Sequence, residues 1–77
     1  MKHLLKIESK YFDDINDGAK RFEIRFNDRD YKLHDTLVLR EIDERGEYTT
    51  RKTRQRIIYT QTKFCADGYI CLGLDFI

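Results

Sequence analysis

The sequence contains no proline or tryptophan, only two cysteines, and no long hydrophobic run. The lack of proline and tryptophan excludes no class of protein by itself. Two thiols cannot form the dense disulfide framework of a small secreted domain, and Cys71 lies within an apolar strand pattern. No segment approaches a transmembrane span, and the apolar run near the N-terminus is too short for a signal peptide. We therefore expect a cytoplasmic protein that does not contact membranes.

Sequence patterns of common metal and nucleotide sites are missing as well. The chain has no Cys-x-x-Cys pair and no paired histidines, so its histidines and cysteines lack the spacing of metal ligands. A glycine-rich phosphate loop and a Ser-His-Asp order are also absent. We expect neither a metal nor a cofactor.

With 77 residues, of which 38% are charged and 40% hydrophobic, the chain has the composition of a globular protein rather than a disordered one. Its length predicts one domain over residues 1–77. Such a short chain buries only about 60–65% of the surface that its unfolded form exposes. The core is therefore expected to be small.

Hydrophobic periodicity predicts an α+β, mostly β fold with one short helix after the first strand. Ser9 is a plausible N-cap of this helix, and Gly18 suits the left-handed position that ends it. Closure of the strands into a compact barrel would remove exposed sheet edges. The expected strands are His3–Glu8, Lys20–Phe26, Thr36–Ile42, Thr49–Thr60 and Tyr69–Ile77, and the expected helix is Lys10–Asp17.

The second expected strand has the most informative pattern. Phe22, Ile24 and Phe26 alternate with charged residues, which is the two-residue period of a strand with one buried face. This pattern predicts that the apolar residues face the core. The opposite face carries Arg21, Glu23 and Arg25 in a row, which is more typical of a binding surface than of a merely solvated one.

Charge is distributed unevenly although the net charge is only +1. Between Tyr48 and Ala66 there is no acidic residue, whereas five cationic residues lie there: Arg51, Lys52, Arg54, Arg56 and Lys63. A locally basic strip favours contact with a polyanion. The alternative is a solvated edge strand whose cations prevent edge-to-edge pairing.

Four segments of the chain, in order, carry a family resemblance. They are His3-Leu4-Leu5-Lys6-Ile7, Tyr11-Phe12 before Gly18-x-Lys20, Phe22-Glu23-Ile24-Arg25 followed by Asn27-Asp28-Arg29, and Asp35-x-Leu37-x-Leu39-x-Glu41. With these segments the chain resembles the ASCH domains of the PUA-like β-barrel superfamily. It is most similar to a small bacterial and phage group of ASCH-like proteins associated with an RNA signal recognition motif. One departure is Thr50, where relatives tend to have glycine.

The resemblance implies a small PUA-like barrel with a cleft beside the helix that binds RNA or a modified nucleoside. It implies that Lys20, Glu23 and Arg25 line this cleft. The guanidinium groups of Arg25 and Arg29 suit phosphate or the acceptor edge of a base. The alternative for Glu23 and Arg25 is a surface salt bridge worth about 0–1 kcal/mol. The full set of expected ligand-binding residues is His3, Lys6, Lys20, Glu23, Arg25, Arg29, Arg51, Arg54 and Arg56.

Several of these residues have second interpretations. A histidine near the N-terminus is usually solvated, although His3 is placed to reach the cleft. Glu41 lies among apolar neighbours in a strand, and we expect it to be a buried partner of either Arg25 or Arg51. Tyr59 fits a stacking platform for a base, but the strand pattern favours a core or rim position.

Two other functions remain open. In some ASCH relatives the equivalent of Lys20 takes part in the hydrolysis of an acetylated cytidine, so a small amidohydrolase would use Lys20 as its working amine. Glu23 or Glu41 would then carry the proton, although the family's threonine position is occupied here by Glu23. A phage or mobile-element protein that binds a host protein is the third possibility. The sequence determines neither the ligand nor the oligomeric state.

Overall fold

Five strands and one short helix make up the computed structural model, which describes residues 1–77. The expected mostly β architecture, with its single helix after the first strand, is confirmed. No helix has the length and apolarity that a membrane span requires. The elements are β1 (Lys2–Glu8), α1 (Ser9–Asn16), β2 (Phe22–Phe26), β3 (Thr36–Ile42), β4 (Tyr48–Gln61) and β5 (Tyr69–Phe76).

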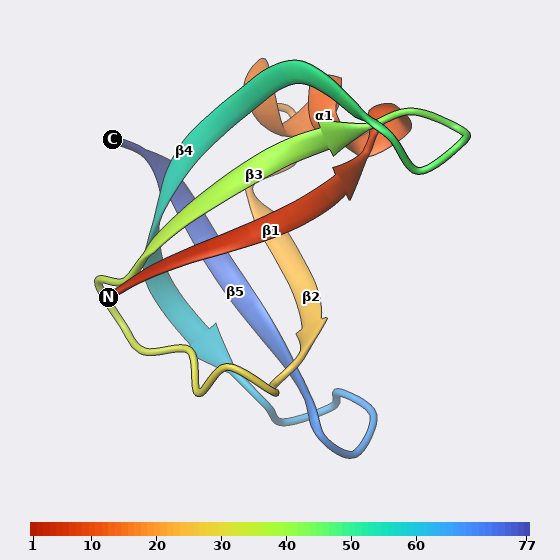
Figure 1. Cartoon of the computed structure of the whole chain (residues 1–77). Coiled ribbons are helices and arrows are strands. Elements are labelled where there is room, and N and C mark those ends of the chain that lie inside the picture. The colour runs from red at the N-terminus through yellow and green to blue at the C-terminus, as the bar shows by residue number, and fades with distance from the viewer.

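The strands form a half-barrel in the order β1-β3-β4-β5-β2 (Figure 1). β1 pairs with β3 in parallel, and all other neighbouring strands are antiparallel. β1 and β3 lie side by side in one wall, the long strand β4 curves away from them, and β5 and β2 form the other wall. Because β1 and β2 do not pair, the expected removal of both sheet edges by closure does not occur, and a seam runs between these strands.

The core lies inside the curve of the sheet. The alternation of β1 and β5 directs Leu5, Ile7, Ile70, Leu72 and Leu74 inward, and all of them are buried. Leu37 and Leu39 of β3 and Ile57 of β4 join them. The helix covers this core with Phe12 and Ile15, which are three residues apart and therefore share one side of the helix.

The helix ends as expected but begins differently. Gly18 adopts φ +87°, the left-handed conformation that glycine tolerates, and its N–H donates to the Ile15 carbonyl at 3.1 Å. The expected Ser9 N-cap is wrong, because Ser9 is the first helical residue and Glu8 holds the cap position without a side-chain bond. The Ser9 hydroxyl instead donates to the Ile42 carbonyl at 3.0 Å and ties the helix start to β3.

β2 places its two faces opposite to the sequence prediction. Phe22, Ile24 and Phe26 are 45%, 55% and 55% exposed, whereas Glu23 is only 5% exposed. The register with β5 explains this, because Glu23 lies opposite Leu72, and residues opposite one another share a face. Since Leu72 faces the core, the charged face of β2 faces inward and its apolar face faces solvent. The expected burial of the three apolar residues is therefore wrong.

A register irregularity in β4 also changes the face of Tyr59. The pairing with β5 shifts between Ile57 and Tyr59, so Ile57 remains buried while Tyr59 is exposed. Gly73 of β5 lies against Tyr59, where a side chain on the glycine would begin 2.9 Å from the tyrosine Cβ. Of the two expected placements of Tyr59, a core or a rim position, the core position is therefore wrong, because a bulge breaks the two-residue alternation.

Candidate functional site

Two arginines bridge the seam that the backbone leaves open. Arg25 of β2 donates from Nη2 to the Lys6 carbonyl at 2.6 Å, and Arg29 donates from Nη1 to the Leu4 carbonyl at 3.0 Å. Both carbonyls belong to β1, which is the edge strand on the other side of the seam. Side chains from β2 and the turn after it thus satisfy edge carbonyls that a sixth strand would otherwise bond.

Glu23 forms the polar centre of the site. Its Oε1 accepts a hydrogen bond from Lys20 Nζ at 2.8 Å, and its Oε2 accepts one from Arg25 Nε at 2.8 Å. An unpaired buried carboxylate would be very costly, so the two cations make its burial possible. The sequence-based alternative of a surface salt bridge does not describe this arrangement, because the Glu23 side chain is only 7% exposed.

These charged groups lie in an open hollow of about 680 Å³ between the start of α1, β1 and β2. Ligand pockets are typically about 300–1,000 Å³, so the hollow has room for a nucleoside. Aromatic side chains border its cations, since Lys20 Nζ lies 4.7 Å from the Tyr11 ring centroid and 5.3 Å from that of Phe22. Of the expected ligand-binding residues, Lys6, Lys20, Glu23 and Arg25 line this hollow, and Arg29 lies nearby on the seam.

Tyr11 and Phe22 were missed by the sequence reasoning as residues of the hollow. The sequence indicates Tyr11 only as part of the Tyr11-Phe12 segment of the family resemblance, and its strand pattern predicts that Phe22 faces the core. Phe22 lies two residues from Lys20 in the sequence and Tyr11 lies nine residues away, so no local pattern indicates the pair. The two rings lie beside Lys20 only in the folded protein.

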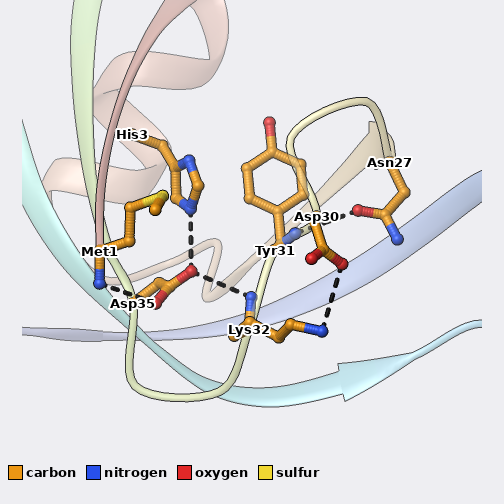
Figure 2. A network of polar contacts seen from close by, with 7 residues as sticks. All are labelled: Met1, His3, Asn27, Asp30, Tyr31, Lys32 and Asp35. Atoms are coloured by element: carbon orange, nitrogen blue, oxygen red, sulfur yellow. Dashed lines mark hydrogen bonds and ion pairs between the residues drawn. The ribbon is translucent and has the colours of Figure 1, made fainter.

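His3 lies outside the hollow, and the two expectations for it are both wrong. It is 4% exposed, its Nε2 donates to Asp35 Oδ2 at 2.9 Å, and its ring packs edge-on against Tyr31 at 4.8 Å (Figure 2). The N-terminal amine and the Lys32 N–H also donate to Asp35. The bond from His3 is the main cause that lowers the pKa of Asp35 to about 2. His3 therefore helps to anchor the segment before β3.

The loop between β2 and β3 is organised by its own polar groups. The Asn27 side chain accepts a hydrogen bond from the Tyr31 N–H at 3.1 Å, which closes the turn after β2 (Figure 2). Tyr31 is buried, and burial raises the pKa of its hydroxyl against the opposing influence of Arg25 and Arg29. The loop therefore places Tyr31 close enough to the two arginines of the seam for their charges to act on its hydroxyl.

Glu41 is paired with Arg51, one of its two expected partners. Arg51 donates from Nε and Nη2 to the two carboxylate oxygens at 2.9 and 2.6 Å, and the Thr49 hydroxyl donates at 2.5 Å. These bonds lower the pKa of Glu41 to about 2, those from Arg51 being the main cause. Arg51 also contacts Asp13 of the helix at 3.0 Å. Arg51 is one of the expected ligand-binding residues, but its guanidinium already has two acidic partners within the protein.

An irregularity in the β3–β4 pairing makes this arrangement possible. The register shifts between Arg40 and Ile42, so Glu41 faces a three-residue stretch of β4 centred on Thr50. Thr50 has φ +94°, a conformation that favours glycine. The resulting bulge directs the side chains of both Thr49 and Arg51 toward Glu41.

The remaining expected residues, Arg54 and Arg56, lie on the outer face of β4 and are exposed. Neither forms an ion pair. A second hollow of about 430 Å³ lies at the start of α1, but its acids Glu8, Asp43 and Glu44 outnumber its one cation, Lys10, so it does not suit a phosphate. No group of three or more histidine, cysteine or acidic side chains is arranged to hold a metal ion.

Fold and site together define a small, mostly β half-barrel with a mixed-charge hollow beside its seam. The chain belongs to the family described as "Domain of unknown function (DUF3850)", which matches residues 2–74. It is similar to the "Uncharacterized 12.9 kDa protein in GpA 3'region" of Escherichia phage P2, with 46% identity over 55 residues. The aligned part is 71% of this chain and 50% of the phage protein, so the chain spans half the length of that relative.

Proposed function

We propose that this protein is a PUA-like domain of the ASCH type that binds RNA or a modified nucleoside in the hollow beside the seam. The observation that carries the proposal is the position of Glu23. This carboxylate is buried between Lys20 and Arg25 at the floor of an open hollow with aromatic walls. A purely structural edge strand has no need to bury an acid with two cations.

The chemistry of the hollow suits a nucleobase. An ionised carboxylate has about four lone-pair sites, and Glu23 uses one on each oxygen, so further sites remain for the N–H groups of a base edge. Arg25 keeps Nη1 free of protein hydrogen bonds, and this group suits a carbonyl or phosphate oxygen. Tyr11 and Phe22 provide faces against which a base can stack, a contact worth about 1–3 kcal/mol.

Binding of a labelled single-stranded RNA oligonucleotide, measured by fluorescence anisotropy at low salt, tests the proposal. Lys20→Ala and Arg25→Gln are expected to lower the affinity about tenfold or more, because each removes a charged contact in the hollow. Arg21→Gln is the matched control. Arg21 is the neighbouring arginine, but it pairs with Asp75 in an exposed contact outside the hollow. We expect it to leave the affinity unchanged.

The fold of each variant is checked by thermal unfolding, because Arg25 also bonds the β1 edge. Titration with cytidine and N4-acetylcytidine, followed by the amide NMR signals of β2, measures binding in the hollow directly. The proposal is wrong if no RNA binds at low salt and neither nucleoside shifts those signals. Equal losses in the Arg21 and Arg25 variants would contradict the assignment of the hollow.

A second candidate is an amidohydrolase that removes the acetyl group of an N4-acetylcytidine-type nucleoside. The contact of 2.8 Å between Lys20 Nζ and Glu23 favours it, because it puts an amine beside a carboxylate that can exchange its proton. Glu41 does not fit this role, since it is bonded to Arg51 and Thr49 outside the hollow. Release of cytidine and acetate by the protein, lost in Lys20→Ala, would establish the activity. If no cytidine is released, this candidate is excluded for that substrate.

A further inference from the structure

The outer face of β1, β3 and β4 carries a cluster of cations that sequence order alone does not reveal. The strand registers align Lys6 with Arg40 and Arg40 with Lys52, which makes a row of three cations across three strands. The next two rows are Leu4–Val38–Arg54 and Lys2–Thr36–Arg56. We call this surface the basic face, and its cations are Lys2, Lys6, Arg40, Lys52, Arg54 and Arg56.

None of these six side chains forms an ion pair. Three other arginines do, since Arg21, Arg25 and Arg51 take part in half of the salt bridges of the protein. The three rows contain no acidic residue. Two acids border the face. Glu8 lies one row beyond Lys6, and Asp75 lies opposite Arg56 but is held by Arg21 at 2.9 Å. The positive charge of the face is therefore uncompensated within the protein.

This arrangement opposes folding stability. Neighbouring strands lie about 4.8 Å apart, and like charges directly opposite one another destabilise a sheet. The row of Lys6, Arg40 and Lys52 contains two such contacts. Protection of a sheet edge does not explain them, because β3 and β4 are internal strands of the sheet (Figure 1). A bound polyanion would remove this repulsion.

Two features favour a nucleic acid over other polyanions. An aromatic ring lies beside the cationic row, since the Arg40 guanidinium lies 3.9 Å from the Tyr48 ring centroid and Lys6 Nζ lies 5.7 Å from it. A base can stack there, as in other single-strand binding surfaces. In addition, Lys6 belongs both to the basic face and to the lining of the hollow, so the two surfaces adjoin across β1.

We propose that the basic face of β1, β3 and β4 binds the sugar–phosphate backbone of a single-stranded RNA, from which one nucleotide enters the hollow. The choice of RNA over another polyanion as the ligand rests on the proposed function, whereas the location of the binding surface rests on the strand registers. Successive rows lie about 6.7 Å apart along the strands, so the face offers cations over several consecutive phosphates. The hollow then recognises a base, and the basic face contributes affinity without sequence preference.

The test compares two double variants that each lose one lysine and one arginine. Lys52→Gln with Arg54→Gln removes two cations of the basic face, whereas Lys63→Gln with Arg45→Gln removes two exposed, unpaired cations from loops. Affinity for a labelled single-stranded RNA is measured over a series of salt concentrations. The first variant is expected to bind about tenfold more weakly at low salt, and the slope of log K against log salt should fall by about 1.4, because each phosphate contact contributes about 0.7.

Two further readouts distinguish this proposal from the proposed function. Free nucleoside binding in the hollow should be unchanged in the Lys52 and Arg54 variant, because neither residue lines it. Thermal stability should stay equal or rise, because repulsion with Arg40 is relieved. If nucleosides fail to bind but the salt slope still falls in this variant, only the hollow is wrong.

Three results would overturn the role of the basic face. One is an unchanged salt slope in the Lys52 and Arg54 variant, and another is an equal loss in the loop variant, which would indicate an effect of net charge alone. The third is binding to vesicles that contain phosphatidylserine as tightly as to the RNA, with the same dependence on Lys52 and Arg54. That result would assign the face to an anionic membrane surface instead.

Discussion

Replacing Thr50 with glycine is expected to stabilise this protein, although most substitutions destabilise. Thr50 has φ +94° at the bulge in β4, and its side chain is exposed. A left-handed conformation costs an L-residue about 1–2 kcal/mol, and β-branched residues adopt it least readily. Glycine removes this cost but loses about 0.5–1 kcal/mol through its greater freedom in the unfolded chain. The free energy of unfolding should therefore rise by about 1 kcal/mol.

The measurement is urea unfolding followed by circular dichroism, together with thermal unfolding. A gain of about 1 kcal/mol corresponds to a rise in Tm of about 4–8 °C for a domain of this size. Thr60→Gly is the control, because Thr60 lies in the same strand without a positive φ. There glycine relieves no strain, so the free energy of unfolding should fall by about 0.5–1 kcal/mol.

The reasoning is refuted if Thr50→Gly leaves the unfolding free energy unchanged or lowers it. The contacts from Thr49 and Arg51 to Glu41 should persist in the variant, because the bulge that directs them suits glycine better than threonine. A crystal structure or the NMR signals of Arg51 would check this. Loss of these contacts would show that the threonine side chain itself supports the bulge.

Three other predictions concern stability and thiol chemistry. Asp35 and Glu41 both have folded-state pKa values of about 2, below their ordinary values, so the unfolded chain takes up protons at a higher pH than the folded protein does. The free energy of unfolding should therefore fall as the pH falls from about 4.5 to 2. Urea unfolding at successive pH values measures this fall, and Glu41→Gln should make the free energy of unfolding less dependent on pH. Gly73→Ala should lower the unfolding free energy by about 1–3 kcal/mol, because the new Cβ would lie 2.9 Å from that of Tyr59, and a double-mutant cycle with Tyr59→Gly, which removes that Cβ, should show a smaller loss from Gly73→Ala. Burial raises the pKa of the Cys71 thiol, so iodoacetamide should modify Cys71 slowly at neutral pH and faster after unfolding. Because Cys65 is also a free thiol, mass spectrometry of peptides assigns the modified site, and rapid modification of Cys71 itself in the folded protein would contradict this burial.

Much of the candidate site could be named from the sequence, but its geometry could not. Lys6, Lys20, Glu23 and Arg25 were expected together and line one hollow. Their arrangement around a buried carboxylate was not foreseen, because the alternation of β2 is compatible with either face pointing inward. The sequence pattern of an edge strand does not indicate which face the neighbouring strand will cover.

His3 shows a different limit of sequence reasoning. Its partner Asp35 is distant in the sequence, and the parallel pairing of β1 with β3 brings the two together. The same pairing aligns Lys6 with Arg40 and completes the basic face. Neither contact follows from local spacing, since each depends on which strands become neighbours.

The sequence by itself determined the number of strands and their positions along the chain, the short helix with its apolar side, and the glycine that ends the helix. These features depend on local backbone preferences and on a periodicity that short segments carry alone. Only the tertiary structure decided that β2 turns its charged face inward, that Arg25 and Arg29 bridge an open seam, and that six cations share one surface. The physical reason is that the register between strands far apart in the chain assigns each side chain to a face, and it is selected by the packing of the whole core.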